Sequence, residues 1–224
     1  MPAPIKPNRT KRCLIVTAVE AERDAFERGL VELPEERRAS VTLLVGGVTA
    51  AVAAAATAVA LAREPFDLVV SAGIGGVFPE SGGLGDLLIA ERIIAADLGA
   101  DGPEGFQSVE ELGFGTTVID SLALDGLKAV GGRDAVRGDM LTVSTGTGTA
   151  ERAAWLRTRY PAAVGEAMEG YGVAVAAAQF ALPVAEVRAA SNLVGPRDRS
   201  AWRIGEALST LTAAAVPIVE GLLG

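Results

Sequence analysis

Short, continuously hydrophobic segments alternate with helical patterns along most of this 224-residue chain. Strands of this kind are typical of a sheet that is covered on both faces, and their alternation with helices predicts an α/β fold. The expected strands span 13–19, 41–45, 68–71, 86–90, 141–144, 163–167 and 184–190. The expected helices span 21–30, 49–63, 150–160, 171–180 and 201–223.

The chain is predicted to form one domain, from residue 13 to residue 224, because it shows neither a repeat nor a linker. Residues 1–12 are basic and proline-rich, and we expect a flexible leader there rather than a signal peptide. Residues 43–62 are uncharged, but Gly46 and Gly47 divide them, which favours a strand and an Ala-rich helix over a membrane span. The polar stretch 97–115 is expected to be a long surface excursion. These features favour a cytoplasmic protein without a membrane partner.

The composition excludes several kinds of chemistry. The chain has 28 Asp and Glu against 20 Lys and Arg, a net charge of −8, which disfavours nucleic acid as a partner. A single Cys excludes an intrachain disulfide, and the lack of His excludes Ser-His-Asp systems, Cys-His systems and His-ligated metals. Catalysis must therefore use carboxylates, amides, hydroxyls, Lys, Arg or backbone groups. No metal or organic cofactor is implied.

Two acidic motifs follow expected strands. Glu20 and Glu22 come directly after the first strand, and open α/β sheets bind ligands at the carboxyl ends of their strands. Alternatively, both acids favour the first turn of a helix, and their spacing lets at most one of them face a given site. Glu169 stands at a strand-to-helix junction in an apolar stretch. It is either a helix N-terminal charge or a buried acceptor for ligand hydroxyls.

Glycine-rich and polar segments mark other strand ends. The sequence S-A-G-I-G-G at 71–76 predicts either a strained turn or a backbone that a ligand approaches closely. The sequence S-T-G-T-G-T at 144–149 is interpreted as a turn with a helix N-cap, in preference to a flexible contact loop. The segment 188–200, R-A-A-S-N-L-V-G-P-R-D-R-S, is the densest polar cluster, although capping and solvent exposure also account for its residues.

Taken in order, these motifs resemble the purine nucleoside phosphorylase and nucleosidase superfamily, over about residues 13–222. The A-V-E-A-E motif ending at Glu22 is similar to that of methylthioadenosine/S-adenosylhomocysteine nucleosidases. V-S-A-G-I-G-G, G-D-L-L-I-A, M-E-G and V-R-A-A-S-N are similar to further segments of the superfamily. The resemblance implies a three-layer fold with a central mixed, twisted sheet flanked by helices.

The same resemblance implies cleavage of an N-ribosidic bond. Glu22 would activate the hydrolytic water, and Glu169, beside Met168, would bind the 2′- and 3′-hydroxyls of the ribose. Main-chain groups around Gly75 would line the ribose side. No glycine- and arginine-rich phosphate loop follows the first strand, which favours water over phosphate as the nucleophile.

The chain departs from the nucleosidases at Asn192, where they carry Asp. An amide suits a 6-oxopurine but cannot donate a proton as an acid does, so Asp198 becomes the candidate proton donor, with helix capping as its alternative role. Segments 101–115 and 191–204 are most similar to the futalosine hydrolases of a route to menaquinone. That similarity implies release of hypoxanthine from an inosine derivative with a carboxylate-bearing tail at C5′.

The resemblance also bears on the C5′ tail of the substrate and on the arrangement of subunits. Arg197 or Arg199 would bind the tail carboxylate through bidentate pairing. In the resembling nucleosidases a neighbouring subunit covers the 5′ pocket, so Phe106, Leu112 or Phe114 would do so in a homodimer or larger homo-oligomer. The alternatives are a methylthioadenosine/S-adenosylhomocysteine nucleosidase, a phosphate-dependent purine nucleoside phosphorylase and a non-catalytic nucleoside-binding protein.

Overall fold

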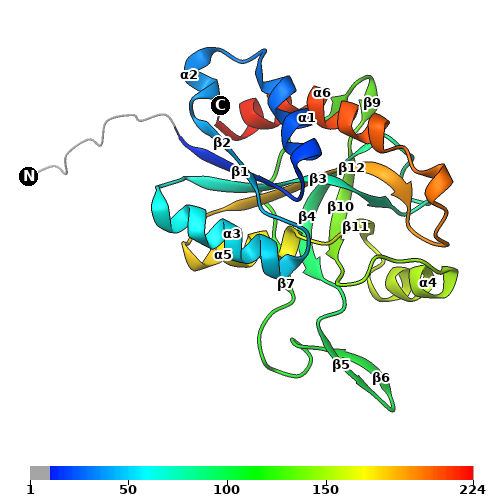
Figure 1. Ribbon diagram of the computed structural model, residues 1–224. Helices are drawn as coiled ribbons and strands as arrows, with labels where there is room; N and C mark the ends of the chain where they lie inside the picture. The colour runs from blue at the N-terminus through cyan, green and yellow to red at the C-terminus, as the bar shows by residue number, and fades with distance from the viewer. Residues whose placement is uncertain (1–10, 224) are drawn as a thin grey trace, which may run out of the picture.

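The architecture is seen in a computed structural model that describes residues 11–223 (Figure 1). The strands are β1 (Cys13–Thr17), β2 (Val41–Val45), β3 (Leu68–Val77), β4 (Leu87–Ala95), β5 (Gly99–Gly102), β6 (Gly105–Ser108), β7 (Val118–Asp120), β8 (Ala129–Val130), β9 (Arg133–Asp134), β10 (Val136–Thr142), β11 (Ala163–Ala167) and β12 (Val184–Leu193). The helices are α1 (Glu20–Leu30), α2 (Glu35–Arg38), α3 (Ala50–Arg63), α4 (Ala150–Arg159), α5 (Gly170–Gln179) and α6 (Ile204–Leu223), with a 3-10 helix η1 (Arg199–Ala201).

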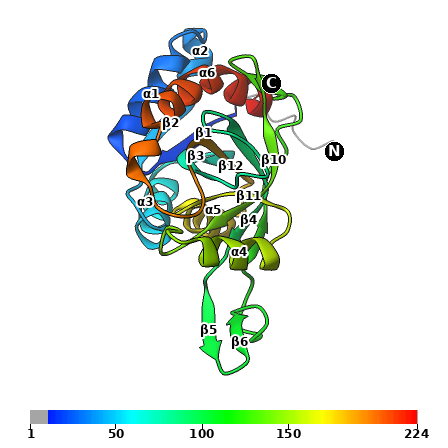
Figure 2. The same ribbon diagram turned by 90° about the vertical axis from the view of Figure 1, so that its right-hand side faces the viewer.

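The elements form three layers, with the sheet between two groups of helices (Figures 1 and 2). Helices α1 and α6 pack together on one face, and α3 and α5 pack together on the other. One hydrophobic core lies on the α1 and α6 side and includes Phe26 and Ile218; a second lies on the α3 and α5 side and includes Ala53 and Val173. The expected α/β fold with helices on both faces is confirmed.

The sheet is mixed and partly closed on itself. Its strand order is β11-β10-β4-β12-β3-β1-β2, with β7 added to β4. Strand β11 runs parallel to β10 and also pairs antiparallel with β3, so five strands form a ring. The ring brings Glu166 of β11 and Asn192 of β12 opposite the same residue of β3, Gly76.

Several expected boundaries were wrong. The segment 71–76 is not a turn, because β3 continues through it to Val77. Pairing with β12 on one side and β11 on the other supplies backbone partners that keep these glycines extended. Similarly, β4 extends to Ala95, β10 begins at Val136, β12 continues to Leu193 and β1 ends at Thr17. The expected last helix divides into η1 and α6, and Asp198 caps η1.

The polar stretch 97–115 lies outside the body of the molecule, as expected, and contains the hairpin β5–β6 (Figures 1 and 2). Most of the expected leader, residues 1–10, lies outside the described residues. Arg12, the last residue of the expected leader, is described and held in place. Its backbone N–H donates to Asp67 Oδ2 at 2.7 Å, and its guanidinium pairs with Glu64.

Two apolar segments are long enough to be compared with a membrane span. Residues 43–62 divide into β2, a glycine-containing turn and α3, as expected from Gly46 and Gly47. Within residues 11–223, α6 is long and apolar enough to span a bilayer by length and composition. Eight of its residues are buried, including Leu211 and Ile218, so α6 is packed as a core helix of this domain.

Candidate active site

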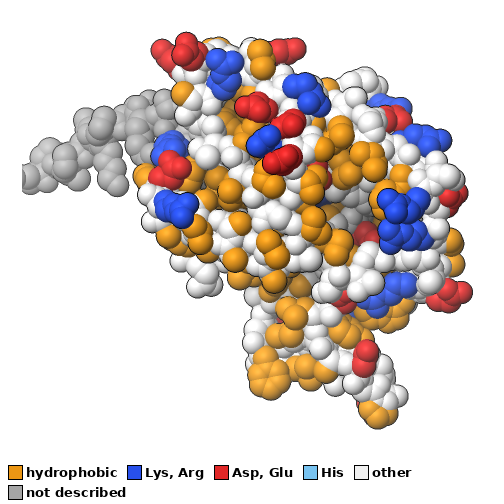
Figure 3. Space-filling model, in the orientation of Figure 1, with side chains coloured by type: hydrophobic (Ala, Val, Ile, Leu, Met, Phe, Trp, Pro, Cys, Tyr) orange, Lys and Arg blue, Asp and Glu red, His pale blue; other side chains and the backbone are white. Residues whose placement is uncertain are grey.

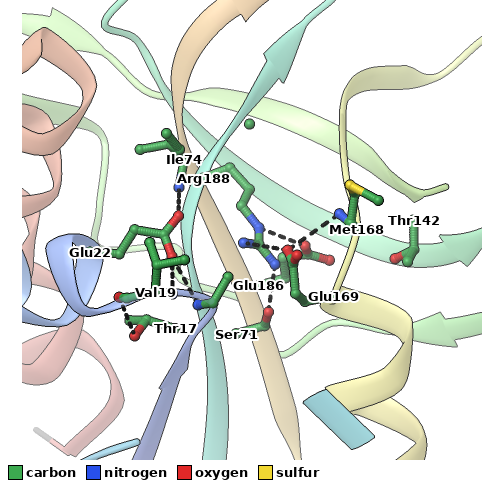
Figure 4. Close-up of polar contacts among 12 residues, drawn as sticks. Thr17, Val19, Glu22, Ser71, Ile74, Thr142, Met168, Glu169, Glu186 and Arg188 are labelled. Carbon is green, nitrogen blue, oxygen red and sulfur yellow. Dashed lines mark hydrogen bonds and ion pairs between the residues drawn. The ribbon is translucent and has the colours of Figure 1, made fainter. Parts of the chain in front are cut away.

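A buried arginine stands at the centre of a group of carboxylates (Figure 4). Arg188 on β12 is only 1% exposed, and its Nε donates to Glu186 Oε1 at 2.9 Å. Nη2 donates to the Ser71 hydroxyl at 2.7 Å, and Nη1 lies 3.3 Å from Glu169 Oε2. Arg188, Glu22, Glu169 and Glu186 are hereafter the Arg188 cluster.

Glu22 reaches the cluster from the first turn of α1. The buried residues of α1 recur at helical spacing from Glu22 through Phe26 to Leu30, so Glu22 shares the inward face while Glu20 is exposed. Glu22 Oε2 accepts the backbone N–H groups of Ala18 at 2.8 Å and Val19 at 3.2 Å. Its Oε1 accepts Ile74 N–H on β3 at 2.8 Å. The carboxylate therefore supports the start of α1 and is also fixed against β3.

Gly73 makes room for two of these charged groups. A Cβ at this position would lie 2.6 Å from Arg188 Nη1 and 2.7 Å from Glu22 Oε1. Both side chains are held by hydrogen bonds to other elements, so neither could move aside without losing a partner. The short gap over Gly73 thus brings the cation and the Glu22 carboxylate together.

We expect Gly73→Ala to lower kcat/KM by about 10-fold or more, because overpacking costs about 1–3 kcal/mol and would displace Glu22 or Arg188. Gly126→Ala is the control, since nothing lies within 4 Å of a Cβ there. Steady-state kinetics and thermal melting of both variants provide the measurement. Unchanged kinetics in Gly73→Ala would mean that this close approach is dispensable.

Glu169 turns toward the cluster instead of capping its own helix. It stands at the N-cap position of α5 without a capping hydrogen bond, and its Oε1 accepts Thr49 N–H at 3.4 Å. Thr49 has φ 87°, a conformation that favours glycine and that non-glycine residues adopt at a cost. The backbone is thus held in an unfavourable conformation where it contacts the Glu169 carboxylate.

Glu186 is the deepest member of the cluster. It is 0% exposed, and its Oε2 has no hydrogen-bond partner among residues 11–223. Burial raises the pKa of Glu186, while Arg188 opposes that rise. One guanidinium therefore lies among three buried carboxylates, and for Glu186 its charge is the main compensation, since Glu22 and Glu169 also accept backbone N–H groups.

A second polar group surrounds Gly76 on β3. Asn192 Nδ2 and Glu166 Cγ lie 3.1 and 3.5 Å from the position of a Cβ on Gly76. The Ser191 hydroxyl donates to Asn192 Oδ1 at 2.8 Å. Thr147 donates to Glu166 twice, from its N–H at 2.7 Å and its hydroxyl at 2.6 Å. Burial raises the pKa of Glu166 despite these two hydrogen bonds.

Two further expected site residues, Met168 and Gly75, lie next to the Arg188 cluster. Met168 N–H donates to Glu169 Oε2 at 3.3 Å, so it belongs beside the cluster. Gly75 packs between β11 and Arg188, where a Cβ would lie 2.8 Å from the Glu166 carbonyl oxygen. Its carbonyl oxygen lies 3.1 Å from the Ser191 hydroxyl, which shares its one hydrogen between this oxygen and Asn192 Oδ1. Gly75 thus lies between the cluster and the Gly76 group.

Asp198, Arg197 and Arg199 lie on the exposed loop after β12. The Ser200 hydroxyl and N–H donate to Asp198 Oδ1 at 2.6 and 2.9 Å and hold the pKa of that carboxyl below its ordinary value. This is the capping arrangement that was the alternative for Asp198. The two guanidiniums lie over the Trp202 ring at 5.6 and 5.9 Å, and neither pairs with a carboxylate among residues 11–223.

The aromatic residues of the excursion have different surroundings. Phe106 packs edge-on against Trp155 of α4 at 5.5 Å, with the Arg159 guanidinium over its ring. Leu112 is partly buried, whereas Phe114 is 82% exposed. Phe106 is thus engaged within this chain, and Phe114 is open to another molecule.

One hollow of about 440 Å³ opens between α4 and the loop after β12. Phe78, Arg157 and Val194 are among its lining residues, and no member of the Arg188 cluster is. Among residues 11–223, no three His, Cys, Asp or Glu side chains are grouped as a metal site would require.

Sequence reasoning missed Arg188 and Glu186 as functional residues, and it missed Glu166. All three are charged residues inside otherwise apolar strands. A strand buried on both faces offers no solvent to such a charge, so each needed a partner elsewhere in the fold. The sequence therefore showed that these three charged residues need buried partners, but it did not show which residues those partners are.

Comparison with known proteins shows the family of the chain. Residues 14–223 match the family model of the phosphorylase superfamily. The chain belongs to the phosphorylase superfamily. Within it, the chain is 49% identical to a Streptomyces coelicolor protein named futalosine hydrolase, over 92% of this chain and 96% of that protein. It is 46% identical to a protein of the same name from Acidothermus cellulolyticus, over 88% of this chain and 86% of that protein.

Solved structures of the phosphorylase superfamily share the fold at low sequence identity. A methylthioadenosine/S-adenosylhomocysteine nucleosidase from Colwellia psychrerythraea, in complex with adenine, aligns with a TM-score of 0.78 at 20% identity, covering 96% of both chains. Futalosine hydrolase from Helicobacter pylori aligns with a TM-score of 0.77 at 17% identity, covering 94% of this chain and 98% of that one. The expected three-layer fold is thereby confirmed.

Proposed function

We propose that this chain hydrolyses the N-ribosidic bond of futalosine and releases hypoxanthine and dehypoxanthine futalosine. The observation that carries the proposal is the Arg188 cluster, which holds two carboxylates, Glu22 and Glu169, beside one buried cation in a chain 49% identical to a protein named futalosine hydrolase. We place the reaction in the cytoplasm, as a step of menaquinone biosynthesis.

The cluster supplies the groups that such a hydrolysis needs on the ribose side. As the glycosidic bond breaks, positive charge develops on the ribosyl ring in an oxocarbenium-like transition state. The carboxylate of Glu22 takes a proton from the attacking water, and that of Glu169 accepts hydrogen bonds from the ribose 2′- and 3′-hydroxyls. Arg188 pairs with Glu169 and is a positioning residue for it in this mechanism, whereas three backbone N–H groups hold Glu22.

The purine side of the reaction accumulates negative charge on the leaving base. Asn192 directs one Nδ2 N–H to the Leu193 carbonyl and has a second N–H to donate to the purine. A donor at this position stabilises a 6-oxopurine through N7 or O6. Asp198 stays our candidate proton donor only in a state in which its cap to Ser200 has opened, since the capped carboxyl favours its ionised form.

Replacing Asn192 by Asp is expected to weaken the preference for 6-oxopurines over 6-aminopurines by about 10-fold or more, because a carboxylate facing the 6-position repels the lone pairs of O6 but accepts an N–H of a 6-amino group. The ratio of kcat/KM for futalosine and for its 6-amino analogue measures the preference. A ratio that does not change would remove Asn192 from purine recognition.

Base release tests the proposed function directly. Purified protein is incubated with futalosine, inosine or methylthioadenosine, with and without phosphate, and the free base is quantified. The proposal expects phosphate-independent hypoxanthine from futalosine and little base from the other two. Adenine from methylthioadenosine would indicate the nucleosidase alternative, and phosphate-dependent release would indicate a phosphorylase. Saturable binding without release would indicate a binding protein.

The loop after β12 is the proposed site for the C5′ tail. Arg197 and Arg199 hold two guanidiniums against Trp202 without a carboxylate partner among the described residues. A tail carboxylate would supply that partner through bidentate pairing. The ring of Trp202 offers an apolar surface beside it.

A homodimer or larger homo-oligomer is proposed on the basis of exposed apolar side chains. Figure 3 shows hydrophobic side chains over α3 and over the excursion below the body. Val52 and Val59 on α3 are each about half exposed, and Phe114 is 82% exposed. Exposed apolar groups of this size are typical of protein contact sites when they form a continuous patch.

We expect light scattering to find at least a dimer and Phe114→Asp to shift it toward monomer while lowering turnover, because a charge would then enter the contact. Val31→Asp is the control, since Val31 is 64% exposed at the end of α1. A monomeric wild-type protein with full activity would contradict the oligomer proposal.

A further inference from the structure

Glu186 has no role in the reaction described so far, although it is the most deeply buried carboxylate of the Arg188 cluster. Its side chain is 0% exposed, and its Oε2 has no hydrogen-bond partner among residues 11–223. Gly170, the first residue of α5, makes the space for it, because a Cβ there would lie 2.1 and 2.3 Å from the two carboxylate oxygens. The fold thus keeps a charged side chain where an apolar one would avoid the cost of burial.

We propose that Glu186 is a positioning residue for ribose recognition. It holds the Arg188 guanidinium at Nε and so prevents Arg188 from closing on Glu169 as a bidentate pair. Glu169 then keeps acceptor sites for the 2′- and 3′-hydroxyls of the ribose. The inference rests on the proposed function, which assigns those hydroxyls to Glu169.

The three nitrogens of the Arg188 guanidinium have three different partners (Figure 4). Nε donates to Glu186 Oε1 at 2.9 Å, and Nη2 donates to the Ser71 hydroxyl at 2.7 Å. Nη1 is left for Glu169, and it lies 3.3 Å from one of the two carboxylate oxygens. Two short contacts therefore fix the guanidinium to β12 and β3, and one longer contact reaches Glu169.

Arg92 and Asp139 show the pairing that Arg188 and Glu169 lack. Asp139 on β10 is 2% exposed and accepts both Nε and Nη2 of Arg92, at 2.8 and 2.5 Å. A bidentate pair of this kind uses both carboxylate oxygens, and it is the geometry that the planar guanidinium favours. Arg188 does not form it with Glu169, because Nε and Nη2 already have partners.

The polar contacts of Glu169 are correspondingly long. Thr49 N–H reaches Oε1 at 3.4 Å, and Met168 N–H reaches Oε2 at 3.3 Å. Hydrogen bonds from N–H groups to oxygen are usually about 2.7–3.2 Å long. An ionised carboxylate accepts about four hydrogen bonds, so weakly held oxygens leave capacity for two ligand hydroxyls.

A purely structural role for Glu186 is the competing explanation. Glu186 would then serve only as a counterion for the buried guanidinium of Arg188. Loss of a counterion lowers stability, and the rates with all substrates fall together with the fraction of folded enzyme. The proposed role instead changes a ratio, which is kcat/KM for a ribonucleoside divided by kcat/KM for its 2′-deoxy analogue. That ratio does not depend on how much of the enzyme is folded.

The experiment measures this ratio with futalosine and 2′-deoxyfutalosine. In Glu186→Met, Arg188 loses its acceptor at Nε and is free to close on Glu169, so we expect the ratio to fall by about 10-fold or more, as for a lost hydrogen bond to a charged group. Glu186→Gln keeps an oxygen for Nε and should stay within a few-fold of wild type. A folded Glu186→Met protein with the wild-type ratio, or an equal fall in Glu186→Gln, would overturn the inference.

A second variant keeps the inference testable if Glu186→Met does not fold. Ser71→Ala removes the partner of Arg188 Nη2 and leaves that nitrogen free to join Nη1 on Glu169. The ratio should fall in the same direction as in Glu186→Met. An unchanged ratio in folded Ser71→Ala would overturn the inference, because release of the guanidinium would then have no effect on ribose recognition.

Asp139→Asn is the matched control. It weakens another pair between a buried carboxylate and an arginine, outside the Arg188 cluster. This variant should keep the wild-type ratio whatever its effect on Tm, which thermal melting records for every variant. A fall in the ratio in Asp139→Asn as large as that in Glu186→Met would mean that general loosening of the fold is enough, and it would overturn the inference.

Failure of the proposed function is visible separately. If futalosine yields no free base, the reaction is wrong, and calorimetry with inosine and 2′-deoxyinosine in phosphate-free buffer gives the corresponding ratio of affinities. A wild-type preference for inosine that is lost in Glu186→Met would then support the role of Glu186, and no preference in wild type would overturn it. If futalosine is hydrolysed and the ratio is the same in every variant, the reaction stands and the role of Glu186 fails.

Discussion

Glu22→Gln is expected to lower kcat on futalosine by about 10²- to 10⁴-fold, because a glutamine cannot take the proton of the attacking water. The amide still accepts the Ala18 and Val19 N–H groups through one oxygen, so α1 should form normally. The contact to Ile74 N–H is lost, which affects only one end of the side chain. Single-turnover kinetics and binding of hypoxanthine by calorimetry separate chemistry from binding.

The structure provides a matched control for this variant. Glu20 stands two residues earlier on the same helix and is exposed, whereas Glu22 is buried. Glu20→Gln should therefore keep wild-type kcat, and both variants should bind hypoxanthine within a few-fold of wild type. Turnover that persists in Glu22→Gln would mean that another group activates the water.

Much of the fold was predictable because local patterns agreed with the final packing. The strands at 41–45 and 163–167 have the expected bounds, and α3 differs from its expected range only by the capping residue Thr49. Strand β3 was underestimated because its glycine-rich half is extended only through pairing with β11 and β12, which lie far away in the sequence. The hairpin β5–β6 was missed because its polar residues show no alternation.

Site residues were predictable from the sequence where their motif lies at the end of an expected strand. They were not predictable where their position depends on closure of the ring of strands. The residues Glu22, Glu169 and Asn192 come directly after or at the end of expected strands, and the structure brings Glu22 and Glu169 to Arg188. The pairing of Glu166 with Thr147 joins β11 to the segment before α4. No local pattern contains that pairing, because the closure of β11 onto β3 creates it.

Arg188→Met is expected to combine a large loss of stability with loss of activity. Removing one partner of a buried ion pair costs about 3–5 kcal/mol, because it leaves an uncompensated charge. For a chain of this length that corresponds to a fall in Tm on the order of 10 °C. Glu186 would lose the Nε contact at 2.9 Å, and Glu169 would lose its nearest cation. Thermal unfolding at pH 7 provides the measurement.

The cause of that loss can be separated from simple loss of packing by a second substitution. Adding Glu186→Gln to Arg188→Met removes a buried negative charge, so the double variant should recover part of the lost Tm while activity stays absent. If packing alone were at fault, the second substitution would leave Tm unchanged or lower it further. Turnover of the double variant should be measured as well. A stable double variant should still lack activity, because it lacks Arg188, the group that positions Glu169.

The pH dependence of Tm also distinguishes loss of the Arg188 charge from loss of packing, without a second substitution. Burial already raises the pKa of Glu186, and Arg188 is the group that opposes the rise. In folded Arg188→Met, Glu186 therefore keeps its proton at pH values at which the same carboxyl has lost it in the unfolded chain. Because the folded state then binds more protons, its stability falls as pH rises above the ordinary carboxyl range. The gap in Tm between wild type and variant should narrow as pH falls from 7 toward 5. A gap that is independent of pH would mean that the arginine matters for its volume and not for its charge.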